Sequence, residues 1–325
     1  DVARVRAQRL AAIAQEQADP EALAQRSLGP VIYGEGHPYG SVGGSGKASA
    51  VESLTPEILA EEHARWLRPE TARLTAVGDV TLAELVPALE AAFGDWRGAE
   101  IAARPKSLAV AVPQARPRLV VIDIPDRPQS VLLLARVLPL DGARQGIEPL
   151  ELANEVIGSG FLSRLNFELR EEKGWTYGIR SSLTDVVGPR ALAVFTSVQA
   201  DRTADSIRLI LERMDAFADG SQGVNAVELQ RVTEGNVRGL PNRYQTNGQV
   251  LAALLANQKF RRPDGYQAML PAIYRDIGAA HIDAAAREFL SPEALAIVVV
   301  GDRRQIDGQL AGLVMEIEYL GAQQL

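Results

Sequence analysis

A duplicated segment constrains the fold of this chain more than any other feature of its sequence. Residues 67–79 read LRPETARLTAVGD and residues 290–302 read LSPEALAIVVVGD, so both open on Leu-x-Pro-Glu and close on Val-Gly-Asp. Amphipathic stretches flank both segments: 56–66 and 82–93 flank the first, and 280–289 and 305–317 flank the second. In each copy the pattern predicts a helix, a proline stop, a buried strand, a turn and a second helix.

The spacing of the two copies predicts the domain organisation. Asp302 lies 223 residues after Asp79, far beyond the roughly 20–50-residue period of a solenoid. The repeat therefore predicts two homologous domains joined by the Pro- and Ala-rich linker 104–117. Residues 118–325 form the second domain, and residues 1–103 hold the C-terminal half of the first. The same offset places the start of the first domain about 105 residues before Asp1, so we expect an N-terminally truncated chain.

Residues 118–325 show the pattern of an α+β domain. Strands are predicted at 118–124, 130–138 and 191–198, and the alternation of Trp175, Tyr177 and Ile179 predicts another. Helices are predicted at 149–157, 161–173, 204–217 and 224–240, with Phe161, Leu165 and Leu169 on one face of the second of them. Gly174 ends that helix. Strands followed by runs of helices indicate a largely antiparallel sheet with helices packed on one face, in each domain.

Composition excludes several classes of function. A net charge of −7 and an isoelectric point near 5.2 argue against a nucleic-acid partner, because phosphate binding needs a basic surface. No stretch approaches the roughly 18 apolar residues of a membrane span. The chain has no cysteine, which excludes disulfides, thiolate zinc sites and cysteine nucleophiles.

Neither the histidines nor the glycine-rich segment predicts a metal or nucleotide site. His37, His63 and His281 are the three histidines, and none has a ligand-type residue at helical spacing, so we expect surface or core roles for them. The segment 43–47, GGSGK, lacks the first glycine and the final Ser or Thr of a phosphate-binding loop. It is interpreted as a flexible surface turn.

One stretch resembles a known family. GFLSRL at 160–165 and LREEKGWTYG at 169–178 closely resemble the pitrilysin/insulinase family of zinc metallopeptidases, the inverzincins. The GHPYG turn at 36–40 and the repeated Pro-Glu … Val-Gly-Asp segments also look like this family's domain ends. The resemblance implies that Arg170 and Tyr177, seven residues apart, are a substrate-holding pair that binds a peptide carbonyl and its oxyanion. From the residues alone, Arg170 would serve the helix dipole and Tyr177 the core.

The resemblance also implies where a zinc site would lie. In the family an inverted H-x-x-E-H helix and a later glutamate bind the metal. The first element would precede Asp1, and the glutamate would fall at about Ala12, in a helix predicted over 2–17. Alanine cannot bind a metal, and Glu16 lies a full helical turn away. The implied chain is therefore zinc-free, with no metal and no cofactor of its own.

We accordingly expect an inactive subunit that needs a zinc-bearing homologous subunit or domain, as in a heterodimer, to hydrolyse peptides. The expected ligand is a peptide substrate, with no nucleic acid and no membrane span, and the resemblance implies a periplasmic location. Two alternatives remain open. A scaffold or core-type homologue with no role in proteolysis is disfavoured by the intact Arg170 and Tyr177 pair, and a fragment of a complete zinc peptidase is disfavoured by Ala12.

Overall fold

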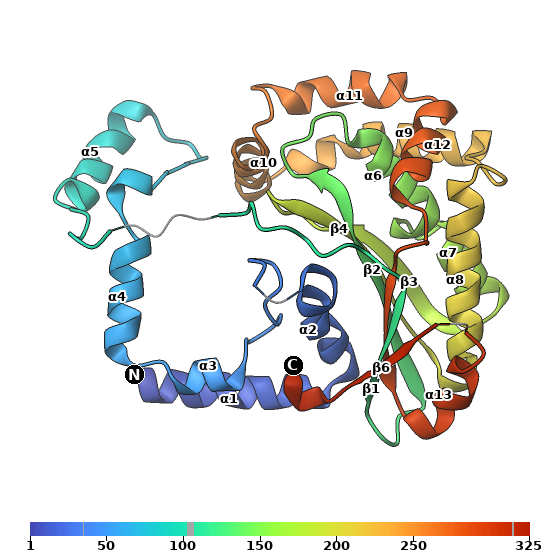
Figure 1. Ribbon diagram of the computed structural model, residues 1–325. Helices are drawn as coiled ribbons and strands as arrows, with labels where there is room; N and C mark the ends of the chain where they lie inside the picture. The colour runs from blue at the N-terminus through green and yellow to red at the C-terminus, as the bar shows by residue number, and fades with distance from the viewer. Residues whose placement is uncertain (35, 103–106, 314) are drawn as a thin grey trace.

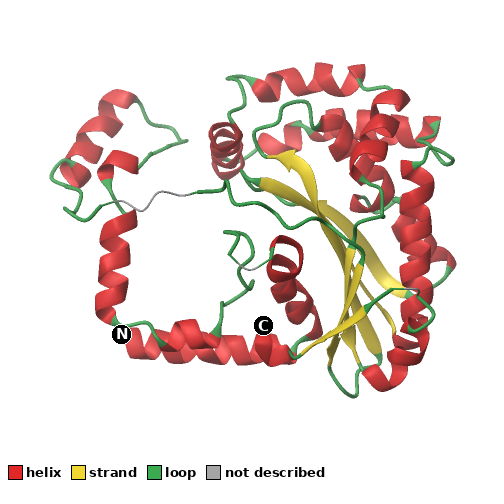
Figure 2. Ribbon diagram, in the orientation of Figure 1, coloured by secondary structure: helices red, strands yellow, loops and turns green. Residues whose placement is uncertain are grey.

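A six-stranded mixed sheet forms the centre of the molecule (Figure 2). The computed structural model describes residues 1–34, 36–102, 107–313 and 315–325. The strand order is β3-β4-β2-β5-β1-β6. The strands are β1 (Arg118–Asp123), β2 (Gln129–Asp141), β3 (Thr176–Leu183), β4 (Pro189–Gln199), β5 (Ala296–Gly301) and β6 (Ile317–Leu320). β2 is antiparallel to β4 and β5, and β3 to β4, whereas β1 is parallel to β5 and β6. The expected α+β class with a largely antiparallel sheet is confirmed.

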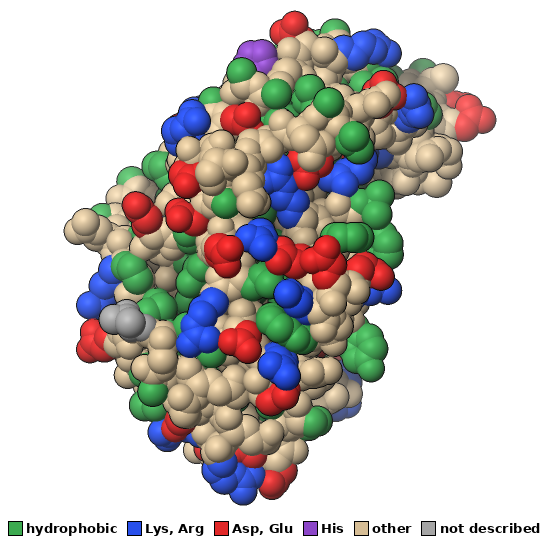
Figure 3. Space-filling view, turned by 90° about the vertical axis from the view of Figure 1, so that its right-hand side faces the viewer, with side chains coloured by type: hydrophobic (Ala, Val, Ile, Leu, Met, Phe, Trp, Pro, Cys, Tyr) green, Lys and Arg blue, Asp and Glu red, His purple; other side chains and the backbone are tan. Residues whose placement is uncertain are grey.

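Helices cover one face of the sheet, as expected, and extend beyond it (Figure 1). They are α6 (Glu148–Asn154), α7 (Arg164–Asn166), α8 (Thr203–Ala218), α9 (Ala226–Gly239), α10 (Asn247–Phe260), α11 (Tyr266–Asp276), α12 (Ala279–Phe289) and α13 (Arg303–Leu310). The core on this face includes Phe217 of α8, Leu152 of α6 and Phe289 of α12, all buried against sheet residues such as Leu134. On the face drawn in Figure 3, acidic and basic side chains are interspersed.

The opposite face of the sheet packs against an N-terminal helix. The N-terminal helices are α1 (Val2–Ala18), α2 (Pro20–Tyr33), α3 (Ala48–Glu52), α4 (Pro56–Trp66) and α5 (Leu82–Phe93). Leu23 and Ile32 of α2 share a buried cluster with Val131, Leu133 and Val298 of the sheet. The central strands are therefore buried on both faces, which is why β1 and β5 are continuous apolar runs and not alternating ones. The predicted boundary at 104–117 stays a prediction, and residues 103–106 lie outside the described residues.

The first copy of the repeat forms its two helices but not its strand. α4 and α5 have the predicted bounds, 56–66 and 82–93. Residues 72–77, however, belong to no strand, although their counterpart β5 pairs with both β1 and β2. A strand requires hydrogen-bond partners on a neighbouring strand, and among the described residues no strand pairs with this segment. Neither helix has a buried residue, and Figure 1 shows both standing away from the sheet.

Two predicted helices need correction. The helix predicted over 161–173 begins at Arg164 and continues as a π-helix, Phe167–Glu172. Phe161 is consequently 68% exposed and not on the apolar helix face. The helix predicted over 305–317 ends at Leu310, and the chain then forms β6 beside β1. Pairing with β1 outweighs the weak helical pattern there, because glycines at 308 and 312 disfavour a longer helix.

Candidate functional site

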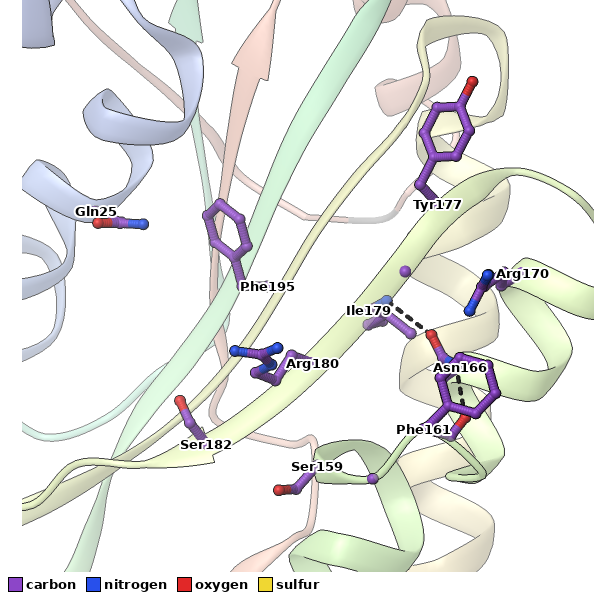
Figure 4. A pocket seen from close by; sticks show the side chains of 12 residues that line it. Gln25, Ser159, Phe161, Asn166, Arg170, Tyr177, Ile179, Arg180, Ser182 and Phe195 are labelled. Carbon is purple, nitrogen blue, oxygen red and sulfur yellow. Dashed lines mark hydrogen bonds between the residues drawn. The ribbon is translucent and has the colours of Figure 1, made fainter. Parts of the chain in front are cut away.

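A cavity of about 700 Å³ lies beside the edge strand β3 (Figure 4). Its walls come from the helical turns that precede β3, from β3 and β4, and from α2. The lining residues are Gln25, Ser159, Gly160, Phe161, Asn166, Arg170, Tyr177, Gly178, Ile179, Arg180, Ser182 and Phe195. The structure thus brings both sequence-predicted site residues, Arg170 and Tyr177, to one cavity.

Tyr177 faces solvent because β3 contains a bulge. Thr176 pairs with Val198, but the next paired residue, Ile179, faces Thr196, so β3 holds one residue more than β4 over this span. A bulge of this kind turns a side chain away from the regular alternation. Ile179 is therefore buried while Tyr177 is 90% exposed. The alternation of Tyr177 and Ile179 expected for a regular strand is wrong, and Tyr177 is not a core residue.

Arg170 lies on the π-helical segment that ends shortly before the turn at Gly174. Its guanidinium carbon lies 4.9 Å from the centre of the Phe161 ring, and its Nε lies 3.5 Å from a carboxylate oxygen of the adjacent Glu171. Gly174 has a φ of 65°, the left-handed conformation that glycine adopts without strain. The glycine turn leads directly from the segment of Arg170 into β3, and Figure 4 shows Arg170 and Tyr177 at the same end of the cavity.

Asn166 connects the two segments that carry this pair, and sequence reasoning did not single it out. The side chain is 5% exposed. Its Nδ2 donates to the carbonyl oxygen of Phe161 at 2.7 Å, and its Oδ1 accepts from the backbone N–H of Ile179 at 3.2 Å. Nothing in the local sequence pattern marks it, because residues three and four positions away include both apolar Leu169 and polar Arg170. Asn166 holds the bulged strand against the turn that carries Phe161.

The described residues do not fit a zinc site. Among them, no group of three or more His, Asp or Glu side chains is placed to hold a metal ion. His37 is buried, stacks on Tyr33 with ring centres 4.9 Å apart, and accepts at Nδ1 from the N–H of Tyr39 at 3.0 Å. Ala12 lies in α1, within the helix where the sequence placed the family's ligand position. The zinc-free character of the chain stays a prediction.

Glu16, the acidic side chain nearest to Ala12 in α1, is engaged in a structural network. It accepts from the backbone N–H of Ser45 at 3.0 and 3.1 Å and from the Ser45 hydroxyl at 2.6 Å, and it pairs with Arg26. Burial alone would raise the pKa of Glu16, but the hydrogen bonds from Ser45 and the charge of Arg26 lower it below 4.5. Arg26, 1% exposed, also donates to the carbonyl oxygen of Gly46 at 2.7 Å.

This network explains the glycine-rich segment 43–47. Gly44 has a φ of 65°, and a Cβ at that position would lie 2.4 Å from an oxygen of Glu16. The glycine is therefore required for the close approach of the loop to Glu16. Instead of a free surface turn, the segment is a loop bound to α1 through Ser45 and Glu16, and to α2 through Arg26 and the carbonyl oxygen of Gly46. Within the described part of the chain, no helix is long and apolar enough to cross a membrane.

Comparisons with known proteins concern the family and the fold of the chain. The model of the peptidase M16 inactive domain matches residues 53–236. An uncharacterised zinc protease of Mycobacterium bovis is 29% identical over 230 residues, which cover 70% of this chain and 50% of that protein. The chain thus spans about half the length of the curated relatives it matches.

Solved structures share the fold. A peptidase M16 inactive domain from Pseudomonas fluorescens superposes with a TM-score of 0.77 at 21% identity, covering 93% of this chain and 70% of that chain. The first half of the periplasmic protease PqqL from Escherichia coli superposes with a TM-score of 0.68 at 14% identity, covering 95% of this chain and 68% of that one. At these identities the likeness concerns the fold.

Proposed function

Because the chain belongs to the pitrilysin family of peptidases, M16, and matches the inactive domain of that family, we propose that it holds the substrate for a zinc-bearing homologous subunit or domain. The two halves together hydrolyse peptide bonds. The partner provides the metal and the activated water. This chain provides Arg170 and Tyr177, which bind the peptide carbonyl group.

The exposure of Tyr177 is the observation that carries this proposal. A tyrosine ring gains stability by packing in the core, and Tyr33 of α2 and Tyr266 and Tyr274 of α11 are buried in this way. The bulge in β3 instead leaves the ring of Tyr177 almost entirely in solvent. A purely structural role does not account for such a position, whereas contact with a ligand does.

The two side chains have the chemistry that the role requires. Arg170 is a permanent cation with several N–H donors, and the Tyr177 hydroxyl donates one hydrogen bond. Both can donate to a carbonyl oxygen whose negative charge increases as water attacks the peptide carbon, and such donors lower the barrier. The Phe161 ring beneath the Arg170 guanidinium restricts its position. Neither side chain activates water, so hydrolysis depends on the partner.

We propose a periplasmic location as well. Its support is the fold that this chain shares with the periplasmic protease PqqL.

A peptidase assay tests the proposal. A quenched fluorescent peptide is incubated with this chain alone, with a zinc-bearing homologue from the same organism, and with the mixture. We expect activity that appears or rises strongly only in the mixture, and a loss of about 10²-fold or more with Arg170→Ala or Tyr177→Phe. Tyr319→Phe is the matched control, because Tyr319 is a half-exposed tyrosine outside the cavity.

Each outcome separates the proposal from its alternatives. Full activity of the mixture with both site variants would mean that Arg170 and Tyr177 are structural, and would favour a scaffold homologue without a role in proteolysis. Zinc-dependent activity of this chain alone would favour the fragment of a complete peptidase. A mixture that is no more active than the homologue alone would refute the division of labour between two halves.

A further inference from the structure

We propose that Arg180 selects peptides that carry a carboxylate, by binding it next to the peptide group held by Arg170 and Tyr177. This inference rests on the proposed function, because it assigns a substrate class to the same cavity. Arg180 is thus a specificity-determining residue.

The position of Arg180 on β3 directs it into the cavity. After the bulge the strand alternates regularly: Ile179 and Ser181 are buried in the core, whereas Arg180 and Ser182 are exposed. Arg180 pairs across the ladder with Phe195 of β4. Figure 4 shows the guanidinium extending beside Phe195, on the side where Gln25 of α2 lies.

The charge of the cavity favours an anionic group. The lining contains two guanidinium groups, Arg170 and Arg180, and neither an aspartate nor a glutamate, although the whole chain has a net charge of −7. Acidic residues of the neighbouring elements have partners elsewhere. Glu21 of α2 accepts from Ser197 at 3.0 Å, and Glu155 accepts from Asn236 at 2.7 Å.

Arg180 differs from Arg170 in that it has no acidic partner. Arg170 contacts Glu171 and the ring of Phe161. Among the described residues, no hydrogen bond, ion pair or ring contact joins Arg180 to another side chain. Its fork of N–H donors is therefore free for a ligand, and the geometry of that fork matches a carboxylate. The adjacent Phe195 offers an apolar wall to the methylene groups of an acidic side chain.

The ligand chemistry is a carboxylate, which a peptide supplies either from an aspartate or glutamate side chain or from its C-terminus. Binding to this chain alone distinguishes these sources without any hydrolysis. Fluorescently labelled, alanine-based peptides carry a single glutamate at successive positions, and each has a glutamine counterpart. Every peptide is prepared with a free and with an amidated C-terminus, and its affinity is measured by fluorescence anisotropy at low and high salt.

We expect the wild-type chain to bind the glutamate peptide about fivefold more tightly than its glutamine counterpart at one preferred position, with a smaller preference at high salt. In Arg180→Gln the preference disappears, and in Arg180→Lys part of it remains because the charge remains. Arg73→Gln, which removes an exposed arginine outside the cavity, leaves it unchanged. A preference that follows the free C-terminus instead identifies that carboxylate as the ligand.

Equal affinity of wild-type protein for glutamate and glutamine peptides, irrespective of the C-terminus, would overturn the inference. The same holds for a preference that persists in Arg180→Gln, and for a wild-type chain that binds none of the peptides. The proposed function fails independently of this, when the mixture shows no peptidase activity that depends on Arg170 and Tyr177. Folding of each variant is checked by circular dichroism and thermal unfolding.

Discussion

Replacing Asn166 by alanine tests whether one buried side chain holds the two segments of the candidate site together. The substitution removes the donor to the Phe161 carbonyl oxygen and the acceptor of the Ile179 N–H. The backbone groups of both segments then lose their partner in a region where Asn166 itself is 5% exposed. Arg170, which also contacts Phe161, lies over its ring.

The expected cost follows from these contacts. A neutral hydrogen bond contributes about 1 kcal/mol to stability, and a buried group left without a partner costs about 1–3 kcal/mol. We therefore expect Asn166→Ala to lower the free energy of unfolding by about 3 kcal/mol. For a domain of this size that corresponds to a melting temperature lower by about 6–12 °C.

Urea unfolding followed by circular dichroism measures the loss, with Asn242→Ala as the matched control. Asn242 is exposed in a surface turn, so its replacement changes the free energy of unfolding by less than about 0.5 kcal/mol. The peptidase assay is then repeated at a temperature where Asn166→Ala is fully folded, and activity of the mixture should fall because Tyr177 loses its support. An Asn166→Ala chain as stable and as active as wild type would refute the supporting role of Asn166. It would mean that the contact between the hydroxyls of Thr176 and Thr196, 2.9 Å apart, maintains the bulge.

Two further predictions concern structural groups. The lowered pKa of Glu16 means that its contribution to stability is complete above pH 4.5 and is lost as the pH falls through the folded-state pKa. Urea unfolding between pH 5 and pH 3, at about half-unit steps, should therefore show that the free energy of unfolding falls more steeply for wild type than for Glu16→Gln. Parallel curves would contradict the role of Ser45 and Arg26. Tyr266→Phe removes the hydrogen bond that the buried hydroxyl donates to Oε1 of Glu148 at 2.5 Å. Thermal unfolding should therefore show a free energy of unfolding lower by about 2 kcal/mol, and an unchanged melting temperature would show that Glu148 finds another donor.

Local signals in the sequence were sufficient for several elements. α4 begins at Pro56, after the capping residue Thr55, and α5 begins after Thr81, whose side chain forms a capping box with Glu84. Such signals act within one helical turn and require no distant contact. The bounds of both helices were therefore predictable to the residue. The strand expected at 72–77 was not, because a strand exists only through its neighbours.

The same distinction applies to the candidate site. The spacing of Arg170 and Tyr177 and the glycine between them were visible in the sequence, whereas their surroundings were not. The contact of Arg170 with Phe161 depends on a turn that makes the predicted helix begin late, at Arg164. Asn166 gained a role only through its contact with β3.

By itself the sequence determined the repeat, most of the helices and strands, and the residue types placed near the turn at Gly174. These depend on local propensity, capping and apolar periodicity. Tertiary structure alone decided that Tyr177 faces solvent, because the bulge arises where β3 pairs with β4, about twenty residues later in the chain. It also decided that α2 covers the second face of the sheet and that Arg180 enters the cavity, since burial depends on which distant segments meet.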